Sequence, residues 1–237
     1  MTAPIAVVIP VLGDQAELAR LLRLVRSQQP KEIVVVSGCA DAGAAALCRE
    51  QGCTYLETAA NRGAQLDEGA RAATTPVPVL WFLHADAVPP ADALQAIEAA
   101  LQTGAESGCF RFAFQGPATW YKRLLESFVS LRVRCGGMVY GDQGLFVRRD
   151  AYIECGGFAP QPLFEEARLV RCLRARGTFV LLPQALGVAT RRWERDGWWR
   201  RTLHNRWLAF RFMLGARPEA LAASYRRLLR SEREREP

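Results

Sequence analysis

A carboxylate ends the most apolar stretch of this chain. Residues 79–83 read Val-Leu-Trp-Phe-Leu and are followed by His84, Ala85 and Asp86. A short apolar run bounded by prolines is typical of a strand that is buried on both faces. In α/β proteins, ligands bind just outside the carboxyl ends of the strands. Asp86 is therefore placed to meet a ligand or a metal, although a residue that caps the turn before Pro89 would occupy the same position.

Further charged residues stand at the ends of other predicted elements. These residues are Asp14, Asp41, Arg62, Asp142, Glu165 and Glu166. Asp14 and Asp41 are also suited to capping helices. Acids at the start of a helix, such as Glu165 and Glu166, are favoured by its dipole alone. From the residue types, each of these groups fits both a ligand-binding role and a local structural role.

Three motifs of nucleotide-binding proteins and hydrolases are missing. No G-x-G-x-x-G follows the first predicted strand, and neither G-x-x-x-x-G-K-[ST] nor G-x-S-x-G occurs. The first two bind dinucleotides and nucleoside triphosphates, and the third holds the nucleophile of many hydrolases. The sequence therefore disfavours all three kinds of chemistry.

Apolar strands and amphipathic helices alternate through the first 190 residues. We predict strands at 5–9, 32–36, 54–57, 79–83, 110–114, 145–148 and 178–182. In the helix between the first two, Leu18, Leu21, Leu22 and Val25 fall on one face. Such a strand–helix–strand unit implies parallel pairing. We expect an α/β fold with a mostly parallel, twisted, Rossmann-like sheet flanked by helices, and a C-terminal helical tail.

The composition fits one folded domain. Half of the 237 residues are apolar, and no run approaches the ~18 apolar residues of a membrane span. The N-terminal stretch lacks the basic flank of a signal peptide. Seven cysteines are scattered without a C-x-x-C pair. This pattern favours reduced, buried side chains in the cytoplasm over a disulfide framework or a zinc site.

The net charge of +7 belongs to the C-terminal region. Residues 191–237 contain 13 Arg against 6 acidic residues, so the first 190 residues are neutral overall. Large apolar residues recur there at helical spacing: Trp198, Trp199, Leu203, Trp207, Phe210 and Leu214. Such a helix can pack its aromatic side on the body or on another subunit, or can lie on an anionic membrane surface. Nucleic acid would also be attracted by this charge, but we expect no such partner.

Seven short stretches occur in an order that is specific as a set. They read I-A-V-V-I-P-V-L, N-R-G-A-Q-L-D-E-G-A, W-F-L-H-A-D, Y-G-D-Q-G-L-F-V-R-R, G-G-F, P-L-F-E-E-A-R-L-V-R-C-L and T-R-R-W. Together they resemble family 2 glycosyltransferases of the GT-A fold, and look closest to the arsenosugar-biosynthesis-type subgroup. The resemblance implies a GT-A domain at 1–193 and a basic amphipathic helical tail at 194–237 that packs on it.

The resemblance implies a nucleotide-sugar site in the first half of the sheet. The residues at the family's donor-binding positions are Pro10, Leu12, Asp14, Ser37, Arg62, Gln65, Asp67, His84, Ala85 and Asp86. Asp86 ends a D-x-D-like motif that in the family holds Mg²⁺ or Mn²⁺ on the diphosphate. Carboxylate and phosphate oxygens are the ligands that these ions prefer. His84 begins the same motif and is equally suited to a buried, hydrogen-bonded role.

The resemblance also implies catalytic and acceptor-side residues. Glu165 and Glu166 stand where the family has an E-D pair whose second member is the general base, so Glu166 would accept the proton of the acceptor hydroxyl. The acceptor-side residues are Asp142, Gln143, Arg192 and Trp193. The implied enzyme is a cytoplasmic, metal-dependent, inverting glycosyltransferase that moves a sugar from a nucleotide-sugar to an acceptor hydroxyl. Peripheral contact with the inner membrane face through the tail, and an oligomer, are both compatible with it.

Three positions depart from the family pattern. Gly13-Asp14 replaces Asn-Glu after the first strand, Val36-Ser37 replaces an Asp that reads the base, and Glu166 replaces an Asp. These departures keep open a second function, that of a catalytically degenerate nucleotide-sugar-binding or regulatory protein. A nucleotidyltransferase would share the α/β body and the metal, but no glycine-rich triphosphate loop follows the first strand.

Overall fold

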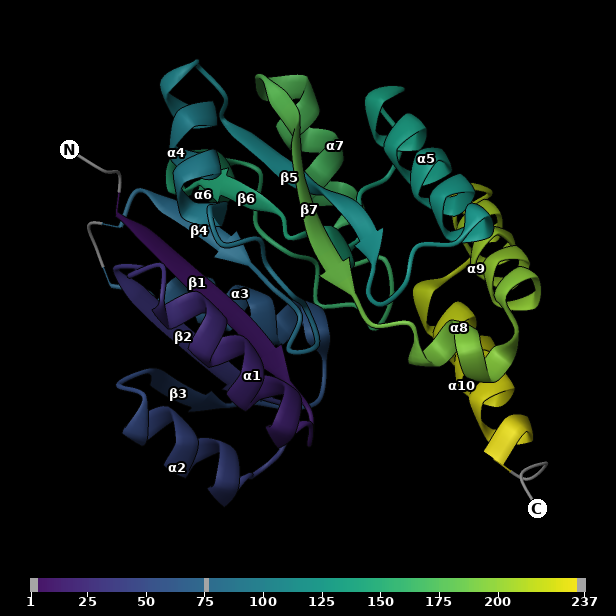
Figure 1. The fold of residues 1–237 in the computed structure, drawn as a ribbon, viewed down its shortest axis with the longest axis horizontal. Coiled ribbons are helices and arrows are strands. Elements are labelled where there is room, and N and C mark those ends of the chain that lie inside the picture. Colours follow the sequence, from purple (N-terminus) through teal and green to yellow (C-terminus); the bar gives the residue numbers. More distant parts are fainter. Residues whose placement is uncertain (1–3, 75–76, 234–237) are drawn as a thin grey trace.

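A seven-stranded sheet forms the centre of the molecule (Figure 1). The computed structural model describes residues 4–74 and 77–233. The strands are β1 (Ile5–Val11), β2 (Glu32–Ser37), β3 (Thr54–Glu57), β4 (Val79–Phe82), β5 (Ser107–Phe114), β6 (Phe146–Arg148) and β7 (Phe179–Val188). They lie in the order β3-β2-β1-β4-β6-β5-β7, and only β6 runs antiparallel to its neighbours. The predicted mostly parallel α/β sheet is confirmed.

Parallel pairing gathers the carboxyl ends of the first strands at one edge of the sheet. β1 pairs with β2 from Ala6–Glu32 to Val11–Ser37, and on its other side it pairs with β4. Asp86 follows β4 by a few residues and so lies at this edge. The edge is the usual ligand-binding position in an open α/β sheet.

Helices cover both faces of the sheet because alternate residues of β1 point to opposite sides. The helices are α1 (Gln15–Arg26), α2 (Ala42–Glu50), α3 (Arg62–Ala72), α4 (Ala93–Gln102), α6 (Arg149–Glu154) and α7 (Ala167–Arg176). The odd-numbered residues of β1 pack with α1, α2 and α4, and its Ala6 and Val8 pack with α3, α6 and α7. The four residues predicted to form the inner face of α1, from Leu18 to Val25, are buried.

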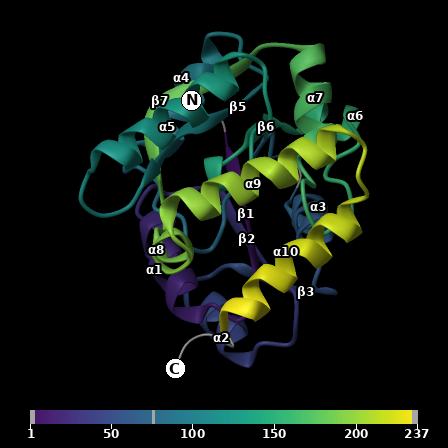
Figure 2. The same ribbon diagram turned by 90° about the vertical axis from the view of Figure 1, so that its right-hand side faces the viewer.

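Four more helices lie beyond the β5–β7 side of the sheet (Figures 1 and 2). They are α5 (Trp120–Arg134), α8 (Arg191–Asp196), α9 (Trp198–Met213) and α10 (Pro218–Arg233). Of the aromatic residues predicted to recur along α9, Trp198 packs on Phe114 and Tyr121, with ring centroids 4.9 and 4.8 Å away. None of the described helices combines the length and the hydropathy of a membrane span.

Large apolar side chains remain exposed on α5 and α9 and form what we call the α5/α9 apolar face. Its members are Trp120, Leu124, Phe128, Leu131, Trp199, Leu203, Trp207, Phe210, Met213 and Leu214. Trp120 and Trp199 connect the two helices, with ring centroids 6.3 Å apart. Most of the tail's aromatic side is therefore not used to close the core of the described body.

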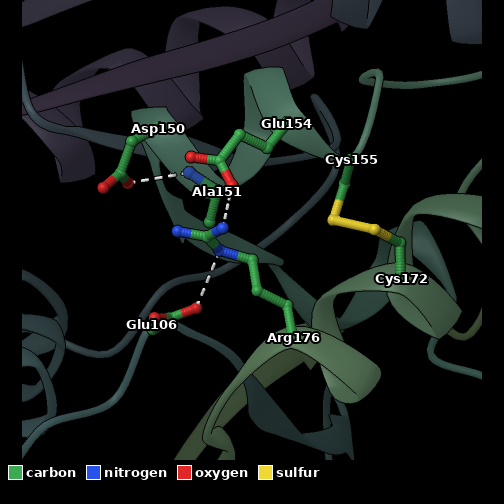
Figure 3. Close-up of a disulfide and its surroundings, with 7 residues drawn as sticks. All are labelled: Glu106, Asp150, Ala151, Glu154, Cys155, Cys172 and Arg176. Atoms are coloured by element: carbon green, nitrogen blue, oxygen red, sulfur yellow. Dashed lines mark hydrogen bonds and ion pairs between the residues drawn. A yellow bond between two sulfur atoms is a disulfide. The ribbon is translucent and has the colours of Figure 1, made fainter.

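Cys155 and Cys172 form a disulfide between the end of α6 and α7 (Figure 3). Their Cα atoms are 5.6 Å apart. The expectation that all seven cysteines are reduced is therefore wrong for this pair, whereas Cys39, Cys48, Cys53, Cys109 and Cys135 are free. The pairing depends on the packing of α6 against α7, which the spacing of the cysteines along the chain does not reveal.

Gln65 joins the carboxyl ends of β1 and β2 from within α3. Its buried amide nitrogen donates to the carbonyls of Val11 and Val36, at 2.9 and 2.8 Å. The Val11 carbonyl also accepts a hydrogen bond from the Gly38 amide at 2.9 Å. Gln65 therefore adds two buried hydrogen bonds that tie α3 to the ends of both strands.

We expect Gln65→Met to lower the free energy of unfolding by about 2 kcal/mol, because it removes two buried hydrogen bonds at about 1 kcal/mol each. Urea denaturation measures the change. Glu68→Met, at an exposed position of the same helix, is the matched control and should shift stability by no more than about 0.5 kcal/mol. Equal stability of the two variants would contradict the assigned role of Gln65.

Candidate active site

A cavity of about 530 Å³ lies at the carboxyl ends of the parallel strands, between the α/β body and the C-terminal helices. It brings together eight residues that the sequence singled out: Asp14, Arg62, His84, Asp86, Asp142, Glu166, Arg192 and Trp193. α8, α9 and α10 supply part of its wall, through Arg201, Asn205 and Tyr225 among others. The cavity therefore contains residues from both sides of the predicted boundary at 193.

Arg62 opens α3 and forms an ion pair with Glu165 across the cavity wall. Asn61 begins the helix by accepting a hydrogen bond from the Ala64 amide at 3.1 Å. Gly63 permits the close approach, because a Cβ there would lie 2.0 Å from the Ala159 carbonyl oxygen and 3.1 Å from Cβ of Glu165. The N-R-G stretch thus brings a cation against a carboxylate that is distant in sequence.

Glu165 and Glu166 are both buried at the start of α7, with 0% and 3% exposure. Phe164, directly before them, has a φ of 59°, which is uncommon for a bulky residue. Its ring is held by Phe212 of α9, with centroids 4.7 Å apart. This turn directs Glu165 to Arg62 and places Glu166 on the cavity.

Glu166 has one bound and one unbound oxygen. Its Oε1 accepts a hydrogen bond from the Gly141 amide at 2.9 Å, and its Oε2 is buried and has no hydrogen-bond partner in the described chain. Burial and the negative charge of Glu165 raise the pKa of Glu166 to about 8, against the lowering effects of Arg62 and the Gly141 amide. A carboxyl group with this pKa can exchange a proton near neutral pH.

Gly141 separates Glu166 from His84. A Cβ at this position would lie 2.4 Å from Nε2 of His84, so only glycine fits without displacement of the imidazole. Burial, followed by the charges of Arg62 and Arg192, lowers the pKa of His84 well below its usual value. His84 is thus a neutral imidazole whose buried Nε2 has no partner within the described residues.

The predicted nucleoside-binding positions lie at the ends of β1 and β2. Pro10 is buried within β1, Leu12 is 62% exposed, and Ser37 is fully buried. The Ser37 hydroxyl donates to the Cys39 carbonyl at 2.7 Å, within its own loop. Ser37 therefore occupies the position where the resemblance implies an Asp that binds the nucleotide base, and its hydroxyl already donates within the protein.

Three predicted residues form polar or core contacts outside the cavity. Asp67 accepts a hydrogen bond from the Tyr152 hydroxyl at 2.9 Å and pairs with Arg71 at 2.7 Å. The buried Gln143 accepts one from Arg132 at 3.0 Å. Ala85 packs against the apolar core beside Asp86. Together with Gln65, these residues do not line the cavity itself.

The glycosyl transferase family 2 model matches residues 6–157. The chain belongs to the family 2 glycosyltransferases. This match covers β1 to the end of α6, including Asp86 and Asp142, and it confirms the family expected from the sequence. None of the curated proteins matches the transferase.

Solved structures of similar fold include glucosyl-3-phosphoglycerate synthase from Mycobacterium tuberculosis. Its complex with phosphoglyceric acid is 16% identical, with a TM-score of 0.58 over 78% of this chain and 71% of that chain. The complex with Mn²⁺, UDP and glucosyl-3-phosphoglycerate gives the same identity, coverage and TM-score. The complex with Mg²⁺ and UDP is 15% identical, with a TM-score of 0.58 over 78% and 70%. The similarity confirms the predicted GT-A fold.

Asp86 and Asp142 of the transferase provide oxygens suited to a divalent cation. Both line the cavity, and Oδ1 of Asp142 is buried without a partner in the described chain. Burial raises the pKa of Asp142 to about 6, and the charge of Asp86 adds to this rise while Arg132, Arg62 and Arg192 oppose it. Across the described residues, no three His, Cys, Asp or Glu side chains converge on one point. The two carboxylates on the cavity, one of them with an unpartnered oxygen, fit a cation that takes its other ligands from phosphate.

The residues that α9 and α10 contribute to the cavity, such as Arg201, Asn205 and Tyr225, were not among those predicted from the sequence. Arg201 is buried, donates to Asp196 at 3.0 Å and also donates to the Tyr225 hydroxyl. Arg192 donates to the same hydroxyl at 3.4 Å. The only signal in the sequence was an arginine on a helix whose apolar spacing suggested a membrane or packing face.

Glu166 makes a distinctive prediction for stability. A carboxyl group whose pKa is raised on folding stabilises the protein below its unfolded pKa, and this stabilisation is lost as the pH rises from 4.5 to about 8. We expect the unfolding free energy of Glu166→Gln to match that of the wild type near pH 4.5. Above about pH 8 it should exceed that of the wild type by at least about 1 kcal/mol.

Urea denaturation across this pH range measures the difference. The control is Glu50→Gln, which changes an exposed glutamate at the end of α2 and should leave the pH dependence unchanged. A constant difference between wild type and Glu166→Gln at all pH values would contradict the raised pKa.

Proposed function

We propose that the protein is a metal-dependent, inverting glycosyltransferase that moves a sugar from a nucleotide-sugar to an acceptor hydroxyl. The observation that carries this proposal is Glu166, whose unpartnered oxygen belongs to a carboxyl group on the cavity with a pKa of about 8. Such a group matches the needs of a general base. Membership of family 2 supports the reaction class.

In the proposed reaction, Glu166 accepts the proton of the acceptor hydroxyl while the hydroxyl oxygen attacks the anomeric carbon. The bond from that carbon to the diphosphate oxygen breaks in the same step, so the configuration inverts. Gly141 keeps the carboxylate oriented through its amide. Glu165 is held by Arg62, and Glu166 is the member of the pair that lines the cavity.

The donor diphosphate is proposed to lie among the cations of the cavity. Arg62, Arg191 and Arg192 line it and supply charge of the required sign. Asp86, with Asp142 nearby, would hold Mg²⁺ or Mn²⁺, which supplies positive charge to the departing nucleoside diphosphate. The solved complexes of the Mycobacterium tuberculosis enzyme with UDP and Mn²⁺ or Mg²⁺ support this choice of ligands.

A second candidate is a catalytically degenerate protein that binds nucleotide-sugars without transfer. It is favoured by one observation, the engagement of the Ser37 hydroxyl within its own loop where the family has a base-reading Asp. Binding of a donor without turnover would distinguish this candidate from the enzyme.

Calorimetry with UDP and GDP, with and without Mn²⁺, tests the donor site. We expect one of them to bind, binding to tighten with Mn²⁺, and Asp86→Ala to weaken it by at least about tenfold, or about 1.4 kcal/mol. Asp92→Ala, at an exposed position before α4, is the control and should bind like the wild type. Absence of nucleotide binding, or no effect of Asp86→Ala, would contradict the proposal.

Glu166→Gln tests the base separately. It should lower turnover by ~10²–10⁴-fold while nucleotide binding is retained, because it removes proton acceptance alone. The measurement is product formation across a panel of nucleotide-sugars and acceptors. Unchanged turnover would transfer the role to Glu165 or another group, and no turnover in the wild type despite donor binding would favour the degenerate protein.

We further propose that the transferase makes peripheral contact with an anionic membrane through the α5/α9 apolar face. Exposed tryptophans beside arginines such as Arg206 are the combination that anchors amphipathic helices at such surfaces. A second copy of the chain is the competing partner for this face, and the test below separates the two.

A further inference from the structure

A second cavity, of about 520 Å³, lies between α5 and α9. We call it the α5/α9 groove. Phe112 and Phe114 of β5, Leu125 and Val129 of α5, and Ala209 of α9 are among the residues that line it. Its size falls within the range of sites that bind small molecules, ~300–1,000 Å³, and its predominantly apolar lining suits a hydrocarbon.

The groove meets the catalytic cavity. Tyr140, Asp142 and Trp193 line both spaces, and Glu166 lines the catalytic side close to them. One molecule could therefore place a polar head beside Asp142 and Glu166 and an apolar chain between α5 and α9. A polar acceptor without a chain would leave the groove unused.

The α5/α9 apolar face borders the groove. Phe128, Leu131 and Met213 belong to the face and also line the groove. The Arg206 guanidinium lies over the Phe128 ring at 5.3 Å, so positive charge stands beside the groove. Apolar side chains mixed with arginine complement an anionic lipid surface, and a molecule leaving that surface would meet the groove directly.

We propose that the acceptor is a membrane lipid, whose hydroxyl-bearing head lies at Asp142 and Glu166 and whose hydrocarbon chain occupies the α5/α9 groove. This inference rests on the proposed glycosyl transfer, since it assigns the acceptor of that reaction. Burial of the chain between α5 and α9 supplies affinity, and the contact between the two spaces directs the head to the base.

The proposal is tested by photolabelling with hexadecanol that carries a diazirine on its chain, in vesicles of phosphatidylcholine and phosphatidylglycerol. We expect the label on peptides of α5 and α9 that line the groove. Val129→Trp and Thr202→Trp fill the groove from opposite walls, and each should reduce labelling by about tenfold or more. Leu203→Trp, on the same helix but 65% exposed and outside the groove lining, should label like the wild type.

Labelling of Val129→Trp and Thr202→Trp at the level of Leu203→Trp would place the chain elsewhere and overturn the proposal. A dimer in sedimentation experiments whose groove peptides stay unlabelled would show that a second copy occupies the face, with the same consequence. Calorimetry with UDP or GDP and Mn²⁺ on the same proteins separates the two hypotheses. Nucleotide binding without groove labelling refutes the lipid acceptor alone, whereas labelling without nucleotide binding refutes the proposed transfer and supports the groove as a lipid site.

Discussion

Two adjacent buried glutamates share one arginine, and the chemistry of the site depends on this imbalance. Glu165 forms the ion pair with Arg62, so Glu166 is buried beside a second negative charge with only partial compensation. Burial of an uncompensated charge is costly, and a carboxyl group in this position binds a proton instead. The resulting pKa of about 8 makes the ionised form of Glu166 a stronger base than an ordinary carboxylate. It also makes the folded protein less stable as the pH rises.

Several features of the fold maintain the arrangement of Glu165, Glu166 and Arg62. α3 and α7 come from distant parts of the sequence, and the absence of a side chain at Gly63 allows them to approach. Gly141 donates to Glu166 and leaves space for the neutral His84. The positive φ of Phe164 turns the chain before the glutamates, and its ring is held from α9. The C-terminal helices are therefore part of the site, and through the α5/α9 groove they extend it towards an apolar acceptor.

Much of this fold could be predicted from the sequence because local patterns determine it. The seven strands occur near their predicted positions. The rule that ligands bind at the carboxyl ends of parallel strands correctly placed Asp86 at the cavity. Contacts between distant segments could not be read in this way. The antiparallel insertion of β6, the disulfide of Cys155 with Cys172, and the bonds of Arg201 to α8 and α10 all depend on tertiary packing. The hydrogen bonds of Gln65 to the ends of β1 and β2 could not be predicted either, because the motif fixes residue identity but not side-chain direction.

The pH dependence of kcat/KM for the wild type and Glu165→Gln tests the central claim most directly, because the acid limb reports the base of the free enzyme. If the charge of Glu165 helps to raise the pKa of Glu166, the acid limb of the wild type lies near pH 8 and moves to lower pH in Glu165→Gln. An acid limb at the same pH in both proteins, or one in the wild type near the ordinary carboxyl value of 4.5, would contradict the account.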